Sequence, residues 1–212
     1  TLPRHHPERH VPLMSDGEEG IPELTESERI RIQATESDFA AMGDALRNGT
    51  ATPEDVEGAF ARFMSLDIDP QKHRNALHIP ADAGPHAAAI ETILRRVPDG
   101  WGRWISVDAG WYPLVIATDQ RLAEIDAQYV VHQIKEKFGT LRYYCAPSND
   151  DPDSELLDAF DAITDDAERA SAITCERCGE PGVPQRTRYW AKTLCAVCGD
   201  ILGYRPATQH DI

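Results

Sequence analysis

Two closely spaced pairs of cysteines near the C-terminal end constrain this chain more than any other feature of its sequence. Cys175 and Cys178 form one pair, Cys195 and Cys198 form the other, and sixteen residues separate the pairs. Two residues between cysteines let one tight turn point both sulfur atoms at a single ion, and a second such turn completes a tetrahedron. We therefore predict that these four residues bind one zinc ion.

The expected ion is structural, because four protein ligands leave no coordination position for a reacting water. Gly179 and Gly199 each follow the second cysteine of a pair, where we expect glycine to supply a positive φ. The alternatives are two disulfides or four unrelated thiols. A reducing cytosol would open disulfides, and two matched redox pairs would be an unusual design. The fifth cysteine, Cys145, has no assignable partner base, so we expect a half-buried strand residue rather than a nucleophile.

The charge of the chain limits its partners. Acidic residues outnumber basic residues by 36 to 21, which gives a net charge of −15. Such a field repels phosphate, which argues against a protein whose main task is to grip a nucleic-acid backbone. Residues 1–5 are polar and lack a signal-peptide core, and no apolar run is long enough to span a membrane. We therefore expect a cytoplasmic protein with no membrane partner.

The N-terminal half predicts an arm and then helices. Residues 1–24 combine four prolines with an acidic run, so we expect a loosely ordered acidic arm. Residues 25–99 predict an acidic helical region, in which Thr52 and Pro53 begin one helix and Gly49 ends the preceding one. Apolar residues recur at helical spacing, and we expect them to be core residues. They are Phe39, Met42, Leu46, Val56, Phe60, Phe63, Met64, Ile90, Ile93, Leu94 and Val97.

Residues 100–172 predict a small mixed unit. We expect a strand at 104–108, a helix at 113–126, a hairpin of strands 129–137 and 140–145, and a helix from 153 to about 172. Regular alternation along the first hairpin strand would place Val130, His132 and Ile134 on one face and Val131 on the other. With a four-cysteine zinc ribbon at 173–205, the sequence predicts an α+β fold.

Two charged segments are candidate partner-binding surfaces. Residues 146–170 hold nine acids against one base, a local charge of −8. The acids of the predicted helix form either a solvated face or a docking surface for a basic partner. We single out Asp158, Asp161, Asp165 and Glu168. On the hairpin, Lys135, Lys137 and Arg142 alternate with aromatic residues. This pattern is typical either of single-strand nucleic-acid binding or of cross-strand pairs that hold the register.

Three segments together resemble a family of uncharacterised bacterial and phage proteins, which share a KEKFG-LR-Y segment followed by a cysteine-rich tail. The segments are 108–114 (DAGWYPL), 129–144 (YVVHQIKEKFGTLRYY) and 171–182 (SAITCERCGEPG) with 192–195 (KTLC). The resemblance implies a bacterial or phage origin and a C-terminal zinc ribbon, and it brings no established activity. By analogy, small binding proteins from such sources include immunity and antitoxin proteins.

The sequence favours a non-enzymatic acidic binding protein, an adaptor, inhibitor or immunity- or antitoxin-like protein that docks on a basic protein. The second hypothesis is a nucleic-acid-associated zinc-ribbon protein that uses the hairpin of residues 135–142. The third is a hydrolase-type enzyme with a site around His132 and Asp108, although neither residue lies in a recognisable catalytic motif.

Overall fold

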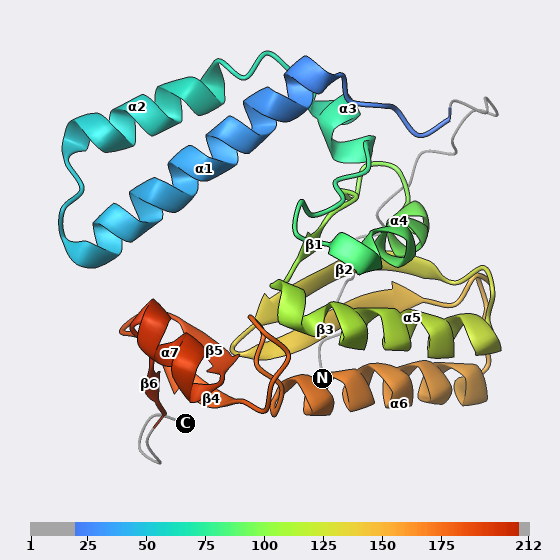
Figure 1. Cartoon of the computed structure of the whole chain (residues 1–212). Coiled ribbons are helices and arrows are strands. Elements are labelled where there is room, and N and C mark those ends of the chain that lie inside the picture. The colour runs from blue at the N-terminus through green and yellow to red at the C-terminus, as the bar shows by residue number, and fades with distance from the viewer. Residues whose placement is uncertain (1–19, 208–212) are drawn as a thin grey trace, which may run out of the picture.

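The computed structural model describes residues 20–207, apart from the side chains of Arg47 and Asn48. Most of the acidic arm expected at residues 1–24 therefore lies outside the described residues. The elements in chain order (Figure 1) are α1 (Glu26–Asn48), α2 (Pro53–Met64), α3 (Pro70–Asn75), the 3-10 helix η1 (Gly84–His86), α4 (Ala87–Arg95), β1 (Ile105–Ser106), the 3-10 helix η2 (Ala109–Trp111), α5 (Tyr112–Ile125), β2 (Val130–Lys137), β3 (Thr140–Ala146), α6 (Ser154–Ser171), β4 (Val183–Arg186), β5 (Ala191–Leu194), α7 (Ala196–Leu202) and β6 (Arg205–Pro206). This mixture confirms the predicted α+β class.

The first sheet carries the main core. Its strand order is β1-β2-β3, with β1 parallel to β2 and β2 antiparallel to β3. Helices α5 and α6 lie side by side against it (Figure 1). The buried core residues are Ile93, Val97, Trp111, Val115, Leu122, Tyr129, Val131, Ile134, Leu141, Tyr143, Phe160, Ile163 and Ala167. Ile93 lies in α4, and Val97 is the second residue after it. The core therefore continues across the boundary expected between residues 99 and 100.

The alternation expected along β2 is wrong. Val131 and Ile134 are both buried in the same core, although they were expected on opposite faces. The pairing of β2 with β3 shifts between Val131 and Gln133, which is a β-bulge. An extra residue on one strand reverses the inward and outward positions beyond it. The strand therefore presents two inward residues three positions apart.

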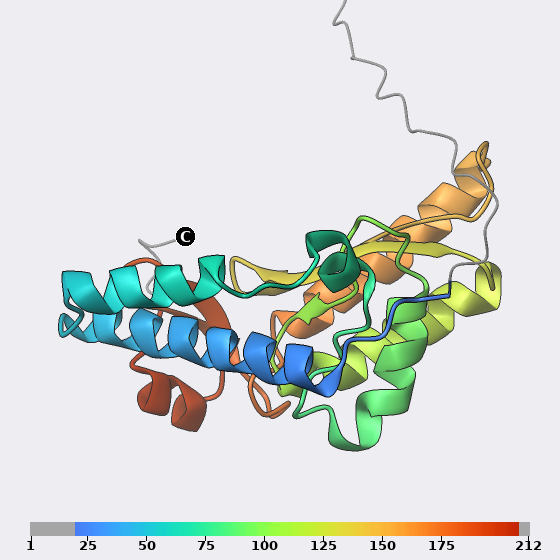
Figure 2. The same ribbon diagram turned by 90° about the horizontal axis from the view of Figure 1, so that it is seen from above.

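Helices α1 and α2 form an antiparallel hairpin, and Figure 2 shows them running side by side away from α3. The predicted end of α1 and start of α2 are confirmed: Gly49 ends α1 with a φ of 67°, and Thr52 and Asp55 form a capping box around Pro53. The expected burial of their apolar residues is wrong, because these side chains are exposed or only partly buried: Phe39, Met42, Leu46, Val56, Phe60, Phe63 and Met64. Two helices that pair mainly with each other leave much of their apolar surface without cover.

The C-terminal residues 173–206, called the ribbon below, form a second small sheet. Its order is β5-β4-β6 with antiparallel pairing throughout, and α7 connects β5 to β6. Within the part of the chain that the structure describes, no helix combines the length and the apolar character needed to cross a bilayer.

Candidate metal centre

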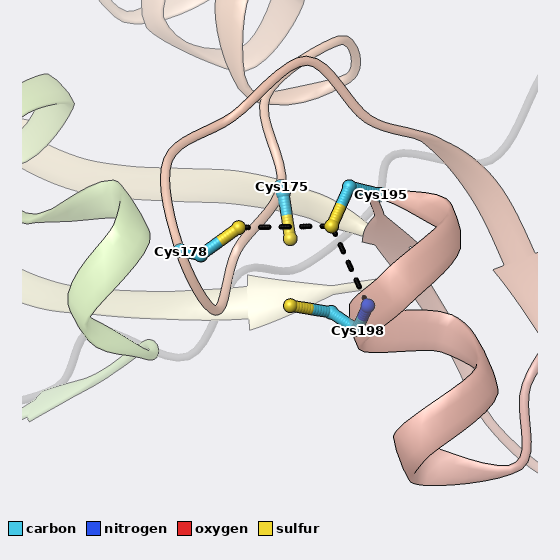
Figure 3. A group of neighbouring side chains, drawn as sticks. All are labelled: Cys175, Cys178, Cys195 and Cys198. Atoms are coloured by element: carbon cyan, nitrogen blue, oxygen red, sulfur yellow. Dashed lines mark hydrogen bonds between the residues drawn. The ribbon is translucent and has the colours of Figure 1, made fainter.

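The four paired cysteines come together at one point of the ribbon (Figure 3). Their Sγ atoms all lie within 4.8 Å of one another, and those of Cys178 and Cys195 are 3.7 Å apart. A tetrahedral site with metal–sulfur bonds of about 2.3 Å has sulfur–sulfur edges of about 3.8 Å. The four residues are therefore close enough to hold one metal ion, as the spacing predicts.

The first cysteine pair lies on a tight turn. The Gly179 N–H donates to the Cys175 carbonyl oxygen at 2.9 Å, which brings the turn back on itself. Gly179 has a φ of 80°, so the expectation of a positive φ at this glycine is confirmed. Cys175 is buried and Cys178 is exposed, so one side of the site faces solvent.

The second cysteine pair lies at the start of α7. Cys195 is the N-cap residue, and its Sγ accepts from the Cys198 N–H at 3.4 Å. The positive φ expected at Gly199 is wrong, because this residue lies inside α7. Glycine is needed there for space, since a Cβ would lie 2.0 Å from Gln185 Oε1. The Gln185 side chain in turn donates to the Leu194 carbonyl oxygen at 2.9 Å and links β4 to the second pair.

The two thiols of α7 differ in acidity. The Cys198 N–H lowers the pKa of Cys195 to about 7, so this thiol readily supplies the anionic sulfur that a metal requires. Burial raises the pKa of Cys198 above the ordinary value of a thiol. An ion bound here must therefore displace a proton from a buried sulfur.

The tight turn that carries Cys175 and Cys178, called the first knuckle below, packs against η2; the turn of Cys195 and Cys198 is the second knuckle. A Cβ on Gly110 would lie 2.4 Å from the Cys175 carbonyl oxygen and 2.4 Å from the Gly179 nitrogen. The neighbouring Trp111 is fully buried in the main core, and its indole N–H donates to the Thr174 carbonyl oxygen at 2.8 Å. The knuckle is therefore in backbone contact with the mixed unit.

An ion-pair network around the buried Glu176 holds the same region. Lys192 Nζ lies 2.8 Å from Glu176 Oε2 and 2.9 Å from Asp108 Oδ2. The Glu176 side chain is 1% exposed and also accepts from the Asp108 N–H at 3.3 Å. Although burial opposes it, the charge of Glu176 raises the pKa of Lys192 above its ordinary value.

The turn of the first hairpin lies against the ribbon as well. Thr193 Oγ1 donates to the Gly139 carbonyl oxygen at 2.7 Å. A Cβ on Gly139 would lie 3.3 Å from the Lys192 carbonyl carbon, so the two backbones nearly touch. Residues 138–139 therefore support the strand that leads into Cys195.

These supporting residues were not predicted as part of the site. They fall within the three segments that carry the family resemblance, so the segments meet at one place in the fold. The supporting residues are Asp108, Gly110, Trp111, Gly139, Thr174, Glu176, Lys192 and Thr193. Burial of a glutamate against a lysine 16 residues away leaves no periodic signal in a sequence.

The candidate acids of α6 take two different positions. Asp158, Asp161 and Asp165 are exposed. Glu168 pairs with Arg142 of β3 at 2.5 Å. The ion pair neutralises one of the four candidate acids with one of the three candidate basic residues. The acidic and basic candidates therefore do not form two separate surfaces.

The other two basic candidates stand over aromatic rings. Lys135 Nζ lies 5.5 Å from the centre of the Tyr144 ring, and Lys137 Nζ lies 5.4 Å from the centre of the Phe138 ring. These are cation–π distances. Both cations lie on the hairpin, as the sequence predicts.

His132 and Asp108 are not brought together. His132 stacks on Trp101 with ring centres 4.6 Å apart, whereas Asp108 binds Lys192. The parallel register pairs Ser106, the last residue of β1, with Lys135, which already lies three positions beyond His132, and Asp108 follows β1. Burial lowers the pKa of His132, as expected for a neutral packed histidine.

Cys145 is partly buried beside the main core. Burial, and then the nearby charge of Asp161, raises the pKa of its thiol to about 12. A thiol this weakly acidic is protonated at neutral pH. This agrees with the expectation of a half-buried strand residue.

Comparison with known proteins gives no relative: no family model, curated protein or solved structure matches the chain, so the resemblance to uncharacterised bacterial and phage proteins rests on the three segments alone.

Proposed function

We propose that this chain is a non-catalytic binding protein that docks on a basic protein partner and contains one structural zinc ion. Its action is that of an adaptor or an inhibitor, in the manner of immunity or antitoxin proteins. The proposal has two parts, the metal and the docking surface, and different residues support each.

Zinc is the metal that best suits four cysteine thiolates in a tetrahedron. The ligands come from two knuckles, and protein groups fill all four positions, so the ion would shape the ribbon and leave no room for a reacting water. Elemental analysis of the purified chain tests this part. We expect one zinc per chain, and a chain that folds its ribbon without metal contradicts it.

A groove between α6 and β3 supports the docking part, and it is the observation that carries the proposal. The α6–β3 groove has a volume of about 210 Å³. Its lining includes Arg142, Tyr144 and Cys145 from β3 and Asp161, Asp165 and Glu168 from α6. Since Arg142 offsets Glu168, two exposed aspartates give the groove its charge.

The outer edge of β3 runs along this groove. β3 is the outer strand of its sheet, and no other strand pairs with it within residues 20–207. The Leu141 N–H donates to Ser171 Oγ at 2.8 Å, so it points away from β2. By alternation, the polar backbone groups of Tyr143 and Cys145 point to the same side of β3, away from β2. An extended segment with lysine or arginine side chains matches both the edge and the aspartates.

The charge of the whole molecule supports the same class of partner. A net charge of −15 attracts a basic protein from a distance and accelerates its encounter with the groove. The effect weakens as salt is added, since exposed charges are screened over about 10 Å at 0.1 M.

A pull-down from lysate of the source organism tests the function with two matched variants. One variant carries Asp158→Asn, Asp161→Asn and Asp165→Asn, and the control carries Glu36→Gln, Glu54→Gln and Glu57→Gln on the α1–α2 hairpin. Both lose three charges. We expect the wild-type chain and the control to retain a basic protein that the aspartate variant loses. Retention by all three chains, or a partner that is not basic, contradicts the proposal.

A further inference from the structure

Three aromatic side chains stand almost free of cover where the first hairpin meets the ribbon. Phe138, at the tip of the first hairpin, is 79% exposed. Tyr189 and Trp190, which end the turn between β4 and β5, are 75% and 61% exposed. These three residues are called the aromatic platform below. Exposing large rings to water is unfavourable, so such a group marks a surface that binds something.

The two turns that carry the platform are fixed close together. The Gly139 backbone nearly touches Lys192, and Thr193 Oγ1 donates to the Gly139 carbonyl oxygen. Trp190 is two residues from Lys192, so its α-carbon lies within about 7–8 Å of the α-carbon of Lys192. The Thr187 N–H donates to the Trp190 carbonyl oxygen at 2.8 Å and closes the second turn. The rings therefore come from two turns whose backbones lie close together.

Phe138 is also strained. Its φ is 56°, in the left-handed region that glycine or asparagine fills at low energy. The Gly139 N–H donates to Glu136 Oε1 at 2.5 Å, which helps to hold the turn. A hairpin turn does not require phenylalanine in order to close. Neither the turn nor core packing therefore explains why an exposed aromatic residue has a strained backbone here.

Cations accompany the rings. Lys137 lies 5.4 Å above the Phe138 ring, and the Arg188 guanidinium lies 5.2 Å above the Tyr189 ring. The acids in this region are engaged elsewhere: Glu136 accepts from Gly139, while Asp108 and Glu176 both bind Lys192. Lys137 and Arg188 thus place two cations directly against the rings of an otherwise acidic protein.

We propose that the aromatic platform binds single-stranded nucleic acid, with two or three bases stacked on its rings and the flanking phosphates beside Lys137 and Arg188. Unpaired bases expose the flat faces that such rings require, whereas a duplex hides them. A basic protein, the partner proposed above, would be repelled by these cations. This inference therefore goes beyond the proposed function and does not depend on it.

With only two cations at the platform, base stacking should contribute more to nucleic-acid binding than phosphate contacts. Two phosphate contacts give a slope of log K against log salt of about −1.4. Binding should therefore persist at salt concentrations that release proteins with many phosphate contacts, which reconciles the site with the acidic charge of the chain.

Fluorescence anisotropy with a labelled 12-nucleotide oligo-dT, a matching oligo-rU and a 12-base-pair duplex tests the proposal on the metal-loaded full chain. We expect both single strands to bind and the duplex to bind at least tenfold more weakly. Trp190→Ala, Tyr189→Ala and Phe138→Ala should each weaken single-strand binding by about 5- to 100-fold. The two oligonucleotides show whether DNA or RNA is preferred.

Two further variants separate lost stacking from lost folding. Phe60→Ala removes an exposed ring on α2 and should leave binding unchanged, while Trp190→Phe keeps a ring at the platform and should retain most of it. Metal content and circular dichroism verify that each variant is folded. The proposal is overturned if no single strand binds, if the duplex binds equally well, or if Phe60→Ala weakens binding as much as Phe138→Ala.

Discussion

Lys192 holds the buried carboxylate of Glu176 at 2.8 Å, although Glu176 lies within the first cysteine pair and Lys192 lies on β5, which leads to the second. Glu176 follows Cys175 directly, and Lys192 precedes Cys195 by three residues. The two cysteine pairs are therefore joined by an ion pair as well as by the metal that they would share.

Replacing Lys192 should reveal how much this ion pair contributes to the stability of the folded chain. Lys192→Met leaves a carboxylate with 1% exposure without its main counter-charge, and we expect a loss of about 3 kcal/mol in the free energy of unfolding. Arg95→Met is the control, because it breaks an exposed pair with Glu91 and should lose less than about 1 kcal/mol. Urea unfolding measures both, and equal losses would show that Glu176 is not held by this charge.

Loss of one ligand should release the metal. We expect Cys195→Ser to reduce the bound metal well below one ion per chain and to make the ribbon sensitive to protease, because a segment this small has little core without its ion. Cys145→Ser changes the same atom outside the cluster and should retain the metal. Elemental analysis and limited proteolysis give the two readouts; metal retained by the Cys195 variant contradicts the assignment.

A single methyl group at residue 110 should separate the ribbon from the mixed unit. The added Cβ of Gly110→Ala would lie 2.4 Å from backbone atoms of the first knuckle, which cannot move aside as a side chain can. We expect a loss of about 1–3 kcal/mol. In Gly58→Ala, inside α2, the added Cβ would lie 3.3 Å from the end of the flexible Arg62 side chain, which can move aside. This variant should instead stabilise the chain slightly, because alanine favours helix. Thermal unfolding of both variants checks the opposite signs.

Two phenylalanines should respond very differently to the same substitution. Phe160 is 4% exposed in the main core, and Phe160→Ala should cost about 3–5 kcal/mol. Phe60 is 59% exposed on α2, and Phe60→Ala should cost less than about 1 kcal/mol. A large loss at Phe60, measured by urea unfolding in dilute solution, would mean that the α1–α2 hairpin is covered there.

His132 should titrate below its ordinary range. Burial lowers its pKa from 6.5, so the unfolded chain binds this proton more readily, and stability falls as the pH drops from about 6.5 through the folded value. NMR titration of the ring measures the midpoint. Trp101→Ala removes the stacked indole and should move the midpoint back up towards 6.5. A midpoint above 6.5 in the wild type would mean that attraction to the indole outweighs burial.

Each cysteine pair of the candidate metal site could be predicted, because its two residues are close in the sequence. Spacing alone brings Cys175 beside Cys178 and Cys195 beside Cys198 within single turns. The seat of the first knuckle could not be predicted in this way. Gly110 and Cys175 are 65 positions apart in the sequence, and nothing at residue 110 itself indicates which backbone will approach it.

The wrong expectations have a common physical origin. Helical periodicity correctly indicates that Phe60 and Phe63 share one face of α2, but it does not say whether another element covers that face. Strand alternation likewise assumes regular pairing, and the bulge after Val131 breaks that assumption. Pattern determines which side chains point together, whereas burial depends on neighbours from elsewhere in the chain.

The packing of the first knuckle against Gly110 and Trp111 determines whether the ribbon can be transferred to another protein. A graft of residues 173–206 onto another protein would carry all four thiols, yet it would leave Glu176 facing water and the Thr174 carbonyl without its indole donor. The ribbon is therefore not an independent module. We expect a graft to keep its structure only if residues 108–111 are transferred together with residues 173–206.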